Sequence, residues 1–334
     1  MTEQISASLQ LAEIIEEKYG LDIITPPKNL PLVHQRRHRK LIVDTDQGKF
    51  LVKTYDNTPE AMDNLAFQHR LSHHLEEHGL PVAHIHPTKE EGTIARVDNW
   101  AMELQRFVES ENMDITPKGL VVSAKALGKL HWDCRDFPCP ERDTRMWRFS
   151  EVPRDLFSKL YEQAKQNSDS SLIDNQCNNI ALFLREAGND LNLQTRMTFE
   201  TGLIHGDWHS GNLLFKDEKL KAIIDLEFAG DGCYLEDLSY AISNLCLRTS
   251  VDREKLTNRT DLMMHYYTQS RTLAPQEEHA LYYAVGIKHV VTVCYQMLQM
   301  KGKVAGHDAV QWMSILDQQT QWLSDRAAKI HYGN

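Results

Sequence analysis

Near the middle of the chain, a carboxylate, an amide and a second pair of carboxylates follow one another at short intervals. His205, Asp207 and Asn212 form an H-x-D-x-x-x-x-N string, and Asp225 and Glu227 follow an apolar run. A carboxylate beside a substrate hydroxyl can accept its proton. Amide and carboxylate oxygens suit Mg²⁺, which keeps several waters and binds ATP phosphates at the same time. Phosphoryl transfer needs these parts, because positioning and charge neutralisation supply most of its catalysis.

Short strands are expected to hold this string in place. Residues 203–204 and 213–215 are apolar and flank it, residues 217–218 have the composition of a turn, and a third strand is expected over residues 220–224. A loop between such strands is a rigid mount for catalytic side chains.

The spacing predicts a role for each oxygen donor. Asp207 is the expected catalytic base, because it lies in the loop where a substrate hydroxyl would approach. Asn212 and Asp225 are the expected metal ligands. Glu227 lies two residues beyond Asp225, so on an extended backbone it points the same way and can reach the metal or its water shell.

At these positions the chain resembles the aminoglycoside phosphotransferase and choline kinase superfamily, which comprises small-molecule kinases with a protein-kinase-like fold. The family loop reads H-G-D-x-H-x-x-N, a D-x-[DE] metal motif follows it, and a D-L-[SA] motif lies on the next helix. The matching residues are His205, Gly206, Asp207, His209, Asn212, Asp225, Glu227 and Asp237. Three of them are expected to be structural: His205 and His209 through hydrogen bonds to the loop backbone, and Asp237 by bracing the loop.

The resemblance implies an α+β, bilobal fold. A small β-rich N-lobe with a helix C would span residues 1–107 and bind the nucleotide. A larger, mainly helical C-lobe would span residues 108–334 and carry the catalytic loop and the substrate pocket. The implied cofactors are ATP and Mg²⁺, and Lys53 in the run F-L-V-K matches the lysine that contacts the ATP phosphates.

One departure from the family concerns the partner of this lysine. The family places a glutamate on helix C to pair with the lysine, whereas Gln68 occupies that position here. Glutamine can donate or accept a hydrogen bond beside Lys53 but cannot neutralise it. Glu76 and Glu77 lie later on the helix and would serve only in a different helical register.

A second departure is the segment expected to cover the phosphates. Residues 33–41 contain no glycine and include the basic run H-Q-R-R-H-R-K. Such a run is either a solvated turn or a set of guanidinium groups that bind phosphate in place of backbone amides. In the second case Arg36 and Arg39 are the expected contacts, because Lys40 already belongs to the following strand.

Composition excludes several classes of protein. A net charge of −10 is unlike the basic excess of a nucleic-acid binder. The most apolar stretch, residues 283–298, is interrupted by Lys288, His289 and Gln296, so no membrane span is expected. The N-terminus lacks a signal-peptide profile and the six cysteines lack metal-ligand spacing, which favours a cytoplasmic protein with reduced thiols. The oligomeric state is not predicted.

The expected partner is a small-molecule alcohol. Asp231, Glu236 and Asp237 make an acid-rich neighbourhood that would favour a cationic substrate, such as a hydroxylated amine. Residues 267–273 and 63–81 faintly resemble the type II homoserine kinase branch, which favours an amino acid. An aminoglycoside, an amino sugar or a choline-like alcohol remains an alternative.

Two other functions are alternatives to a small-molecule kinase. A protein Ser/Thr kinase is disfavoured because Asp225 is not followed by Phe-Gly and no A-P-E-like close follows. A pseudokinase-like, nucleotide-binding regulatory module is suggested by Gln68 and the glycine-free segment. The intact set of Asp207, Asn212, Asp225 and Glu227 argues against that reading.

The remaining elements follow from periodicity and turn residues. The pattern predicts helices over residues 5–19, 58–78 and 117–132, strands over 40–45, 49–55, 93–97 and 101–107, an exposed polar loop over 163–179, and helices from residue 235 to the end.

Overall fold

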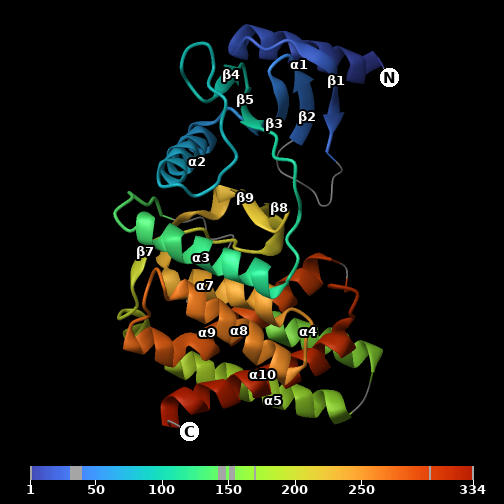
Figure 1. Cartoon of the computed structure of the whole chain (residues 1–334). Helices are drawn as coiled ribbons and strands as arrows, with labels where there is room; N and C mark the ends of the chain where they lie inside the picture. The colour runs from blue at the N-terminus through green and yellow to red at the C-terminus, as the bar shows by residue number, and fades with distance from the viewer. Residues whose placement is uncertain are drawn as a thin grey trace. The chain divides into compact units, whose positions relative to one another are not determined.

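The computed structural model describes residues 2–30, 40–141, 148–149, 155–168, 171–300 and 302–332. The chain divides into two compact units. The first comprises Met1–Glu111 together with Leu214–Lys216 and Lys221–Glu227, and the second comprises the remaining residues. The first is built on a sheet and the second is mainly helical (Figure 1). The predicted α+β class, with a small β-rich part followed by a larger helical part, is confirmed.

An antiparallel sheet of five strands forms the body of the first unit. Its strand order is β1-β2-β3-β5-β4. The strands are β1 (Ile23–Asn29), β2 (Lys40–Thr45), β3 (Gly48–Asp56), β4 (Ala95–Val97) and β5 (Trp100–Arg106), and the two helices are α1 (Thr2–Tyr19) and α2 (Pro59–Glu77). Thr58 is the N-cap of α2, since its side chain accepts a hydrogen bond from the Ala61 N–H and Pro59 occupies the first turn.

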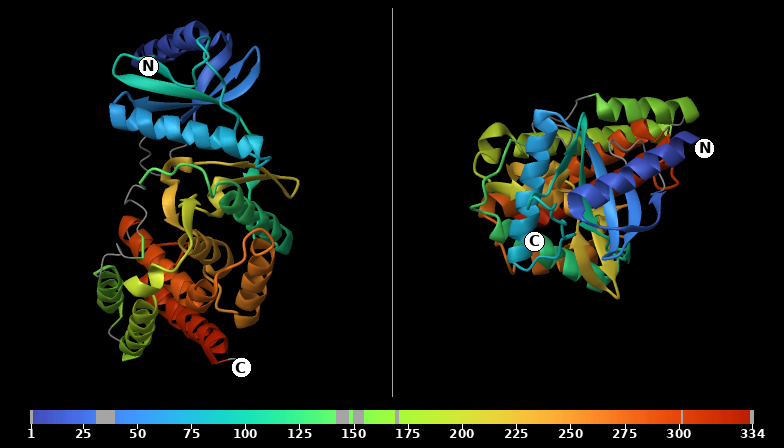
Figure 2. Two further views of the ribbon diagram at one scale, coloured as in Figure 1. Left: turned by 90° about the vertical axis from the view of Figure 1, so that its left-hand side faces the viewer. Right: turned by 90° about the horizontal axis from the view of Figure 1, so that it is seen from above.

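The two helices of this unit cover opposite faces of the sheet (Figure 2, left). The α1 face buries Phe50 and Val52 of β3 and Met102 and Leu104 of β5 in one hydrophobic cluster. Side chains alternate between the faces of a strand. The intervening positions of β3 and β5 therefore point toward α2, and Lys53 and Glu103 are among them.

Strand β1 was not predicted. It contains Pro26 and Pro27, which lower the expectation of a strand because proline cannot donate a ladder hydrogen bond. The strand lies at the edge of the sheet and pairs with β2 alone, through an irregular register between Ile23 and Asn29. An edge position tolerates proline because one row of its backbone groups has no neighbouring strand.

Helices dominate the second unit, in agreement with the prediction for its C-terminal part. They are α3 (Pro117–Asp133), α4 (Leu156–Asn167), α5 (Ser171–Asp190), α6 (Leu193–Arg196), α7 (Tyr234–Ile242), α8 (Arg253–Tyr267), α9 (Pro275–Gln299) and α10 (Ala309–Tyr332). Strands β7 (Thr201–Ile204) and β10 (Gly230–Cys233) pair antiparallel. A further small sheet has the order β6-β8-β9 and contains β6 (Glu111–Asn112), β8 (Leu213–Lys216) and β9 (Lys219–Ile223).

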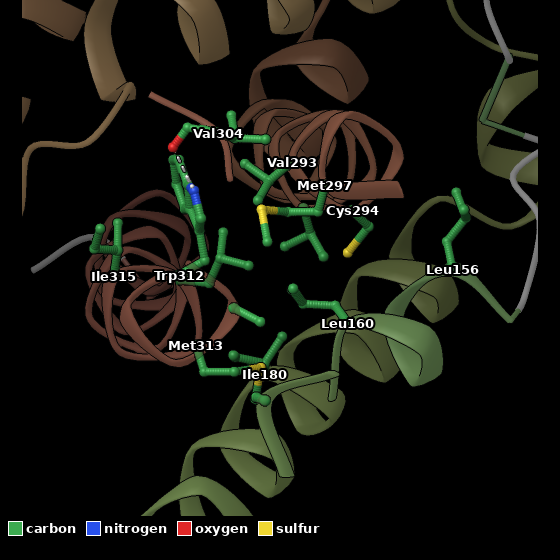
Figure 3. Close-up of a cluster of buried hydrophobic side chains, with 14 of the residues drawn as sticks. Leu156, Leu160, Ile180, Val293, Cys294, Met297, Val304, Trp312, Met313 and Ile315 are labelled. Atoms are coloured by element: carbon green, nitrogen blue, oxygen red, sulfur yellow. Dashed lines mark hydrogen bonds between the residues drawn. The ribbon is translucent and has the colours of Figure 1, made fainter. Parts of the chain in front are cut away.

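A hydrophobic cluster holds α4, α5, α9 and α10 together (Figure 3). Leu160 and Ile180 pack with Met297 and Met313, and the indole N–H of Trp312 donates to the carbonyl of Val304 at 3.0 Å. Within the described ranges, no helix combines the length and the hydropathy needed to span a bilayer.

The exposed loop predicted over residues 163–179 is wrong. The end of α4 and the first half of α5 occupy most of it. Ile173, Ile180 and Phe183 are buried at helical spacing, with exposed polar side chains between them. The polar residues are therefore the solvent face of an amphipathic helix and do not mark a loop.

Candidate active site

The loop after β7 carries His205, Asp207 and Asn212, as the sequence predicted, and it belongs to the second unit. Gly206 has φ of +79°, a left-handed conformation that favours glycine. A Cβ at this position would lie 2.4 Å from the carbonyl oxygen of Phe228. Any other residue would therefore shift the loop, and this requirement explains the glycine beside Asp207.

Asp237 of α7 fixes the backbone of this loop. Its carboxylate is almost completely buried and accepts hydrogen bonds from the His205 N–H at 2.8 Å and the Gly206 N–H at 3.0 Å. His131 of α3 contacts the same carboxylate through Nε2 at 3.0 Å. Burial raises the pKa of Asp237, but the bonds to His131 and His205 outweigh it and hold the pKa below its usual range. The charged form is thus kept in place beneath the loop.

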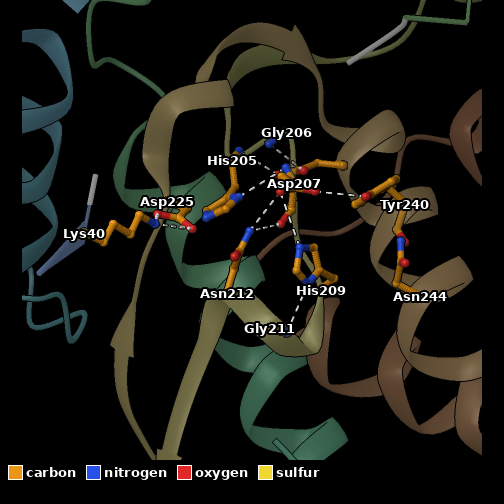
Figure 4. Close-up of polar contacts among 11 residues, drawn as sticks. Lys40, His205, Gly206, Asp207, His209, Gly211, Asn212, Asp225, Tyr240 and Asn244 are labelled. Atoms are coloured by element: carbon orange, nitrogen blue, oxygen red, sulfur yellow. Dashed lines mark hydrogen bonds and ion pairs between the residues drawn. The ribbon is translucent and has the colours of Figure 1, made fainter. Parts of the chain in front are cut away.

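The loop histidines contact backbone groups. Nδ1 of His205 accepts from the Asp207 N–H at 3.2 Å, and Nδ1 of His209 accepts from the Gly211 N–H at 3.0 Å (Figure 4). Trp208 is fully buried and donates from Nε1 to the hydroxyl of Ser123 on α3 at 2.9 Å. Trp208 is therefore a buried packing residue of the loop. The loop is anchored to α3 through Trp208 and to α7 through Asp237.

The carboxylate of Asp207 is surrounded by donors (Figure 4). Tyr240 donates to Oδ1 at 2.9 Å, the side-chain amide of Asn212 donates to Oδ2 at 3.0 Å, and Nε2 of His209 lies 3.4 Å from Oδ2. Burial raises the pKa of Asp207, but His209, His205 and Tyr240 together outweigh it and lower the pKa. Asp207 is consequently an anion at neutral pH, as a proton acceptor must be.

In the first unit, the counter-ion of Lys53 comes from an unexpected element. Glu103 of β5 lies directly opposite Lys53 in the ladder between β3 and β5, and Oε1 is 3.8 Å from Nζ. Tyr55 donates to the same oxygen at 2.7 Å, and Nε2 of His69 on α2 bonds to the other oxygen. Burial raises the pKa of Glu103, but His69, Lys53 and Tyr55 lower it overall, so this fully buried carboxylate is ionised.

None of the three α2 residues discussed from the sequence is the counter-ion of Lys53. Gln68 lines the same cavity as Lys53. Glu76 is exposed and lies 3.2 Å from Nδ1 of His84, while Glu77 is exposed beside His73. The register shift that would have brought Glu76 or Glu77 to Lys53 is absent from α2. Glu103 of β5 thus neutralises Lys53. The charge of the lysine is balanced even though Gln68, and not a glutamate, occupies the position on α2.

Glu103→Gln is expected to lower the free energy of unfolding by about 2 kcal/mol, because a charge-assisted contact to buried Lys53 is lost. The folded-state pKa of Glu103 is lowered, so its stabilisation is present above the unfolded pKa and is lost as the pH falls through the folded value. Urea titrations at neutral and acidic pH should show the difference from wild type shrinking in acid. Exposed Glu76→Gln is the control, and equal effects of both changes would contradict this role.

Asp225 also contacts lysines of the first unit. Nζ of Lys40 donates to Oδ1 at 3.1 Å, and Nζ of Lys53 lies 3.6 Å from the same oxygen. Arg36 and Arg39, the expected phosphate contacts, lie outside the described residues. Lys40 begins β2, as expected, and its side chain is one of two described lysines that reach Asp225.

The reasoning that aligned Glu227 with Asp225 is wrong. Asp225 has φ of +57°, and Leu226–Phe228 form a short 3₁₀-helix. The backbone is therefore not extended between the two carboxylates, and strand alternation does not give their relative directions. A metal-binding role of Glu227 stays a prediction, but strand alternation no longer supports it.

A partly open pocket lies beside these charges in the first unit. It combines a cation, two carboxylates and an apolar floor. Its lining comprises Lys53, Gln68, His69, Ser72, Ala83, Ile85, Glu103, Gln105, Ile223, Ile224, Asp225 and Leu226. An apolar wall with a few convergent charged groups is typical of a small-ligand site.

The acid-rich neighbourhood predicted after the metal motif contains basic partners as well. Arg148 pairs with Asp231 at 3.0 Å, and Lys288 lies 3.8 Å from Glu236. Glu236 also accepts from the backbone N–H of Phe149 at 2.6 Å. The region is therefore of mixed charge, which weakens the expectation of an anionic mouth.

Comparison with known proteins places these features in a family. The sequence profile described as "Phosphotransferase enzyme family" matches residues 30–262. A homoserine kinase of Parvibaculum lavamentivorans is 23% identical over 244 residues, which cover 72% of this chain and 70% of that protein.

Solved structures share the fold. An aminoglycoside phosphotransferase from Alicyclobacillus acidocaldarius has a TM-score of 0.66 at 15% identity, covering 90% of this chain and 94% of the other. An amicoumacin kinase in complex with AMP-PNP, Ca²⁺ and Ami has a TM-score of 0.64 at 12% identity, covering 97% and 96%. These likenesses confirm the protein-kinase-like fold. Because the family profile covers well over half of the chain, the protein belongs to the phosphotransferase enzyme family and is a small-molecule kinase.

Proposed function

We propose that this kinase transfers the γ-phosphoryl group of ATP to the hydroxyl of a small hydroxylated amino acid of the homoserine type. The observation that carries the proposal is the environment of Asp207. Its carboxylate is ionised, oriented by Tyr240 and Asn212, and mounted on a loop that Asp237 holds. A base prepared in this way can take the proton from an attacking hydroxyl as the bond to phosphorus forms.

The other site residues receive roles that follow from their chemistry. Lys53 would contact the ATP phosphates, since Glu103 holds it in a fixed position. Asn212, whose amide nitrogen is directed at Asp207, would offer its amide oxygen to the metal. Asp225 would supply a charged oxygen to the same ion.

Mg²⁺ is the proposed metal. The amicoumacin kinase of the same fold was solved with a nucleotide analogue and Ca²⁺, which supports the use of a nucleotide and a divalent cation. Oxygen donors from an amide and a carboxylate suit Mg²⁺ better than a softer metal, and Mg²⁺ bridges phosphates readily. All six cysteines are free thiols, which fits the proposed cytoplasmic location.

Two observations favour an amino acid over a polycationic sugar. A curated relative is a homoserine kinase. The Arg148–Asp231 and Lys288–Glu236 pairs offer charges of both signs near the strand and helix that support the catalytic loop. Of these, the Arg148–Asp231 pair is partly exposed and the Lys288–Glu236 pair is buried. A substrate with an ammonium and a carboxylate group complements the exposed pair, whereas a polycation would meet the like charge of Arg148.

A substrate panel tests this function. The enzyme is assayed for ADP release with Mg-ATP and L-homoserine, L-serine, a simple amino alcohol, choline, an aminoglycoside and a Ser-containing peptide. We expect kcat/KM for an amino acid to exceed that for the aminoglycoside and the peptide at least tenfold. Asp207→Asn measures background ATP hydrolysis. Turnover of the peptide or the aminoglycoside above that of every amino acid would overturn the proposed substrate class.

Replacing Arg36 and Arg39 with serine separates the two readings of the basic segment. If they bind phosphate, ATP affinity should fall about tenfold for each lost contact, and the loss should shrink at high salt because exposed charges are screened. Adenosine affinity should not change. Equal losses for ATP and adenosine, measured by calorimetry, would leave the segment as a solvated turn.

A further inference from the structure

Three potential metal ligands meet where three helices of the second unit end or begin. Asp190 is the last residue of α5, His279 lies near the start of α9, and His331 lies near the end of α10. One ligand atom from each lies within 4.8 Å of the others. We propose that these residues form a binding site for a divalent transition-metal cation, with Zn²⁺ as its best occupant. None of them belongs to the candidate active site, so the inference goes beyond the proposed function.

The carboxylate of Asp190 points to a missing cation. Its side chain is 17% exposed, and Oδ2 is buried without a hydrogen-bond partner. Oδ1 lies 3.5 Å from Nε2 of His279. A buried carboxylate oxygen with no donor costs free energy, and a bound cation removes that cost.

The two imidazoles are arranged as a pair. Their rings stack with centroids 3.5 Å apart and an interplanar angle of 3°. Because the lone pair of an imidazole nitrogen lies in the plane of its ring, the ring of His279 has to rotate about its Cβ–Cγ bond before both imidazoles can bind one ion. Nε2 of His331 lies 3.2 Å from the backbone carbonyl of His279. A metal-binding histidine commonly donates its second N–H to a carbonyl, which fixes the ring and the tautomer. In that tautomer Nδ1 of His331 is the unprotonated nitrogen and serves as the ligand atom.

The donor set selects the class of metal. Zn–N and Zn–O bonds of about 2.0–2.1 Å in a tetrahedron separate neighbouring donors by about 3.3 Å, close to the 3.5 Å between Asp190 and His279. Two imidazoles and one carboxylate suit Zn²⁺, Co²⁺ or Ni²⁺, whereas Mg²⁺ prefers an all-oxygen shell. With three protein ligands, a water completes the coordination.

Metal at this position would tie together the ends of helices that already share a core. The cluster of Figure 3 packs α5, α9 and α10 against one another through apolar side chains. A cation would add a polar link between them at the surface, where His279 is half-exposed. Binding to the folded state alone raises Tm by mass action.

Metal titration of the full-length, chelator-treated protein tests the site. Calorimetry is expected to give one Zn²⁺ per chain and a higher Tm with Zn²⁺ than with Mg²⁺. His279→Ala, His331→Ala and Asp190→Asn should each weaken Zn²⁺ binding tenfold or more, while the exposed His73→Ala should not. Turnover with Mg-ATP should stay unchanged in His279→Ala, which keeps this test independent of the proposed kinase reaction.

Cobalt gives a second readout that does not depend on stability. Co²⁺ bound by two imidazoles and a carboxylate should show d–d absorption without a thiolate charge-transfer band, and His279→Ala should lose it. Zn²⁺ affinity that is equal in wild type and in all three variants would overturn the site. So would a thiolate band, because it would assign the metal to cysteine.

Discussion

Replacing Asp207 with asparagine is expected to lower kcat by about 10²–10⁴-fold, the usual contribution of a positioned general base. The dissociation constant of Mg-ATP should change only a few-fold, because the proposed role of Asp207 is to accept the hydroxyl proton of the substrate. Asparagine keeps the size of the side chain, and its amide oxygen can still accept from Asn212 while its NH2 group faces the Tyr240 hydroxyl. Steady-state kinetics with the best substrate of the panel, together with nucleotide calorimetry, measure both quantities.

The pH profile adds a direction to this prediction. Burial raises the pKa of Asp207, but His209, His205 and Tyr240 lower it overall. The base is therefore competent at neutral pH, and kcat should decline only when the pH falls through this lowered value in the enzyme–substrate complex. Tyr240→Phe removes one of the lowering contacts, so its acid limb should move to higher pH.

A matched pair of variants distinguishes the base from a residue that merely supports the loop. Asp207→Asn should lose kcat at every pH, whereas Tyr240→Phe should approach wild-type kcat at high pH. If Asp207→Asn retains turnover within a few-fold of wild type, another group accepts the proton. A loss confined to Tm, with kcat preserved, would likewise assign Asp207 a structural role.

Local patterns carried most of the sequence prediction. The strands beside the catalytic loop and the start of α2 near Thr58 depend on neighbouring residues, so periodicity and turn residues identified them. The segment over residues 163–179 failed because its polar face was taken for a loop and its buried positions were not counted at helical spacing. The edge strand β1 was hidden by its prolines.

Glu103 was missed for a different reason. It is 50 positions from Lys53, and their contact requires the pairing register of β3 and β5, which one sequence does not reveal. A signal was present all the same: Glu103 stands between Met102 and Leu104 in an apolar strand. An acid in that setting needs a buried partner, and the lysine of the neighbouring strand is the natural candidate.

Glu227 shows the opposite error, in which a local rule was applied where the backbone does not obey it. Its alignment with Asp225 assumed an extended chain, but β9 ends at Ile223 and Asp225 has a left-handed φ. Non-glycine residues adopt this conformation infrequently, and such positions are enriched at functional sites. The left-handed φ of Asp225 therefore removes the reason to align Glu227 with it, and at the same time supports a functional role for Asp225 itself.

Asp225→Asn is expected to impair nucleotide binding and turnover together, in contrast to Asp207→Asn. In the proposed reaction Asp225 holds the Mg²⁺ that bridges to the phosphates, so the loss of its charge should lower kcat/KM about a thousandfold or more. The rise in Tm caused by Mg-ATP should largely disappear, because a ligand stabilises only as far as it binds.

The lysines beside Asp225 make this prediction sharper. Lys40 and Lys53 lie 3.1 Å and 3.6 Å from Oδ1 of Asp225. When the aspartate becomes neutral, both cations lose an anionic partner and attract phosphate more strongly. Metal-free ATP should therefore bind Asp225→Asn as well as or better than wild type, while Mg-ATP binds worse.

This inversion can be measured by comparing ATP affinity in Mg²⁺ and in excess chelator. Asp44→Asn is the control: Asp44 lies in the sheet that carries Lys40 and Lys53 but contacts Lys49 and Thr25, so this change should preserve the wild-type preference for Mg-ATP. A general loss of folding would weaken both forms of ATP alike, so it cannot imitate the inversion. If Asp225→Asn binds Mg-ATP as tightly as wild type does, Asp225 is not a metal ligand. Its role would then be to form ion pairs with Lys40 and Lys53.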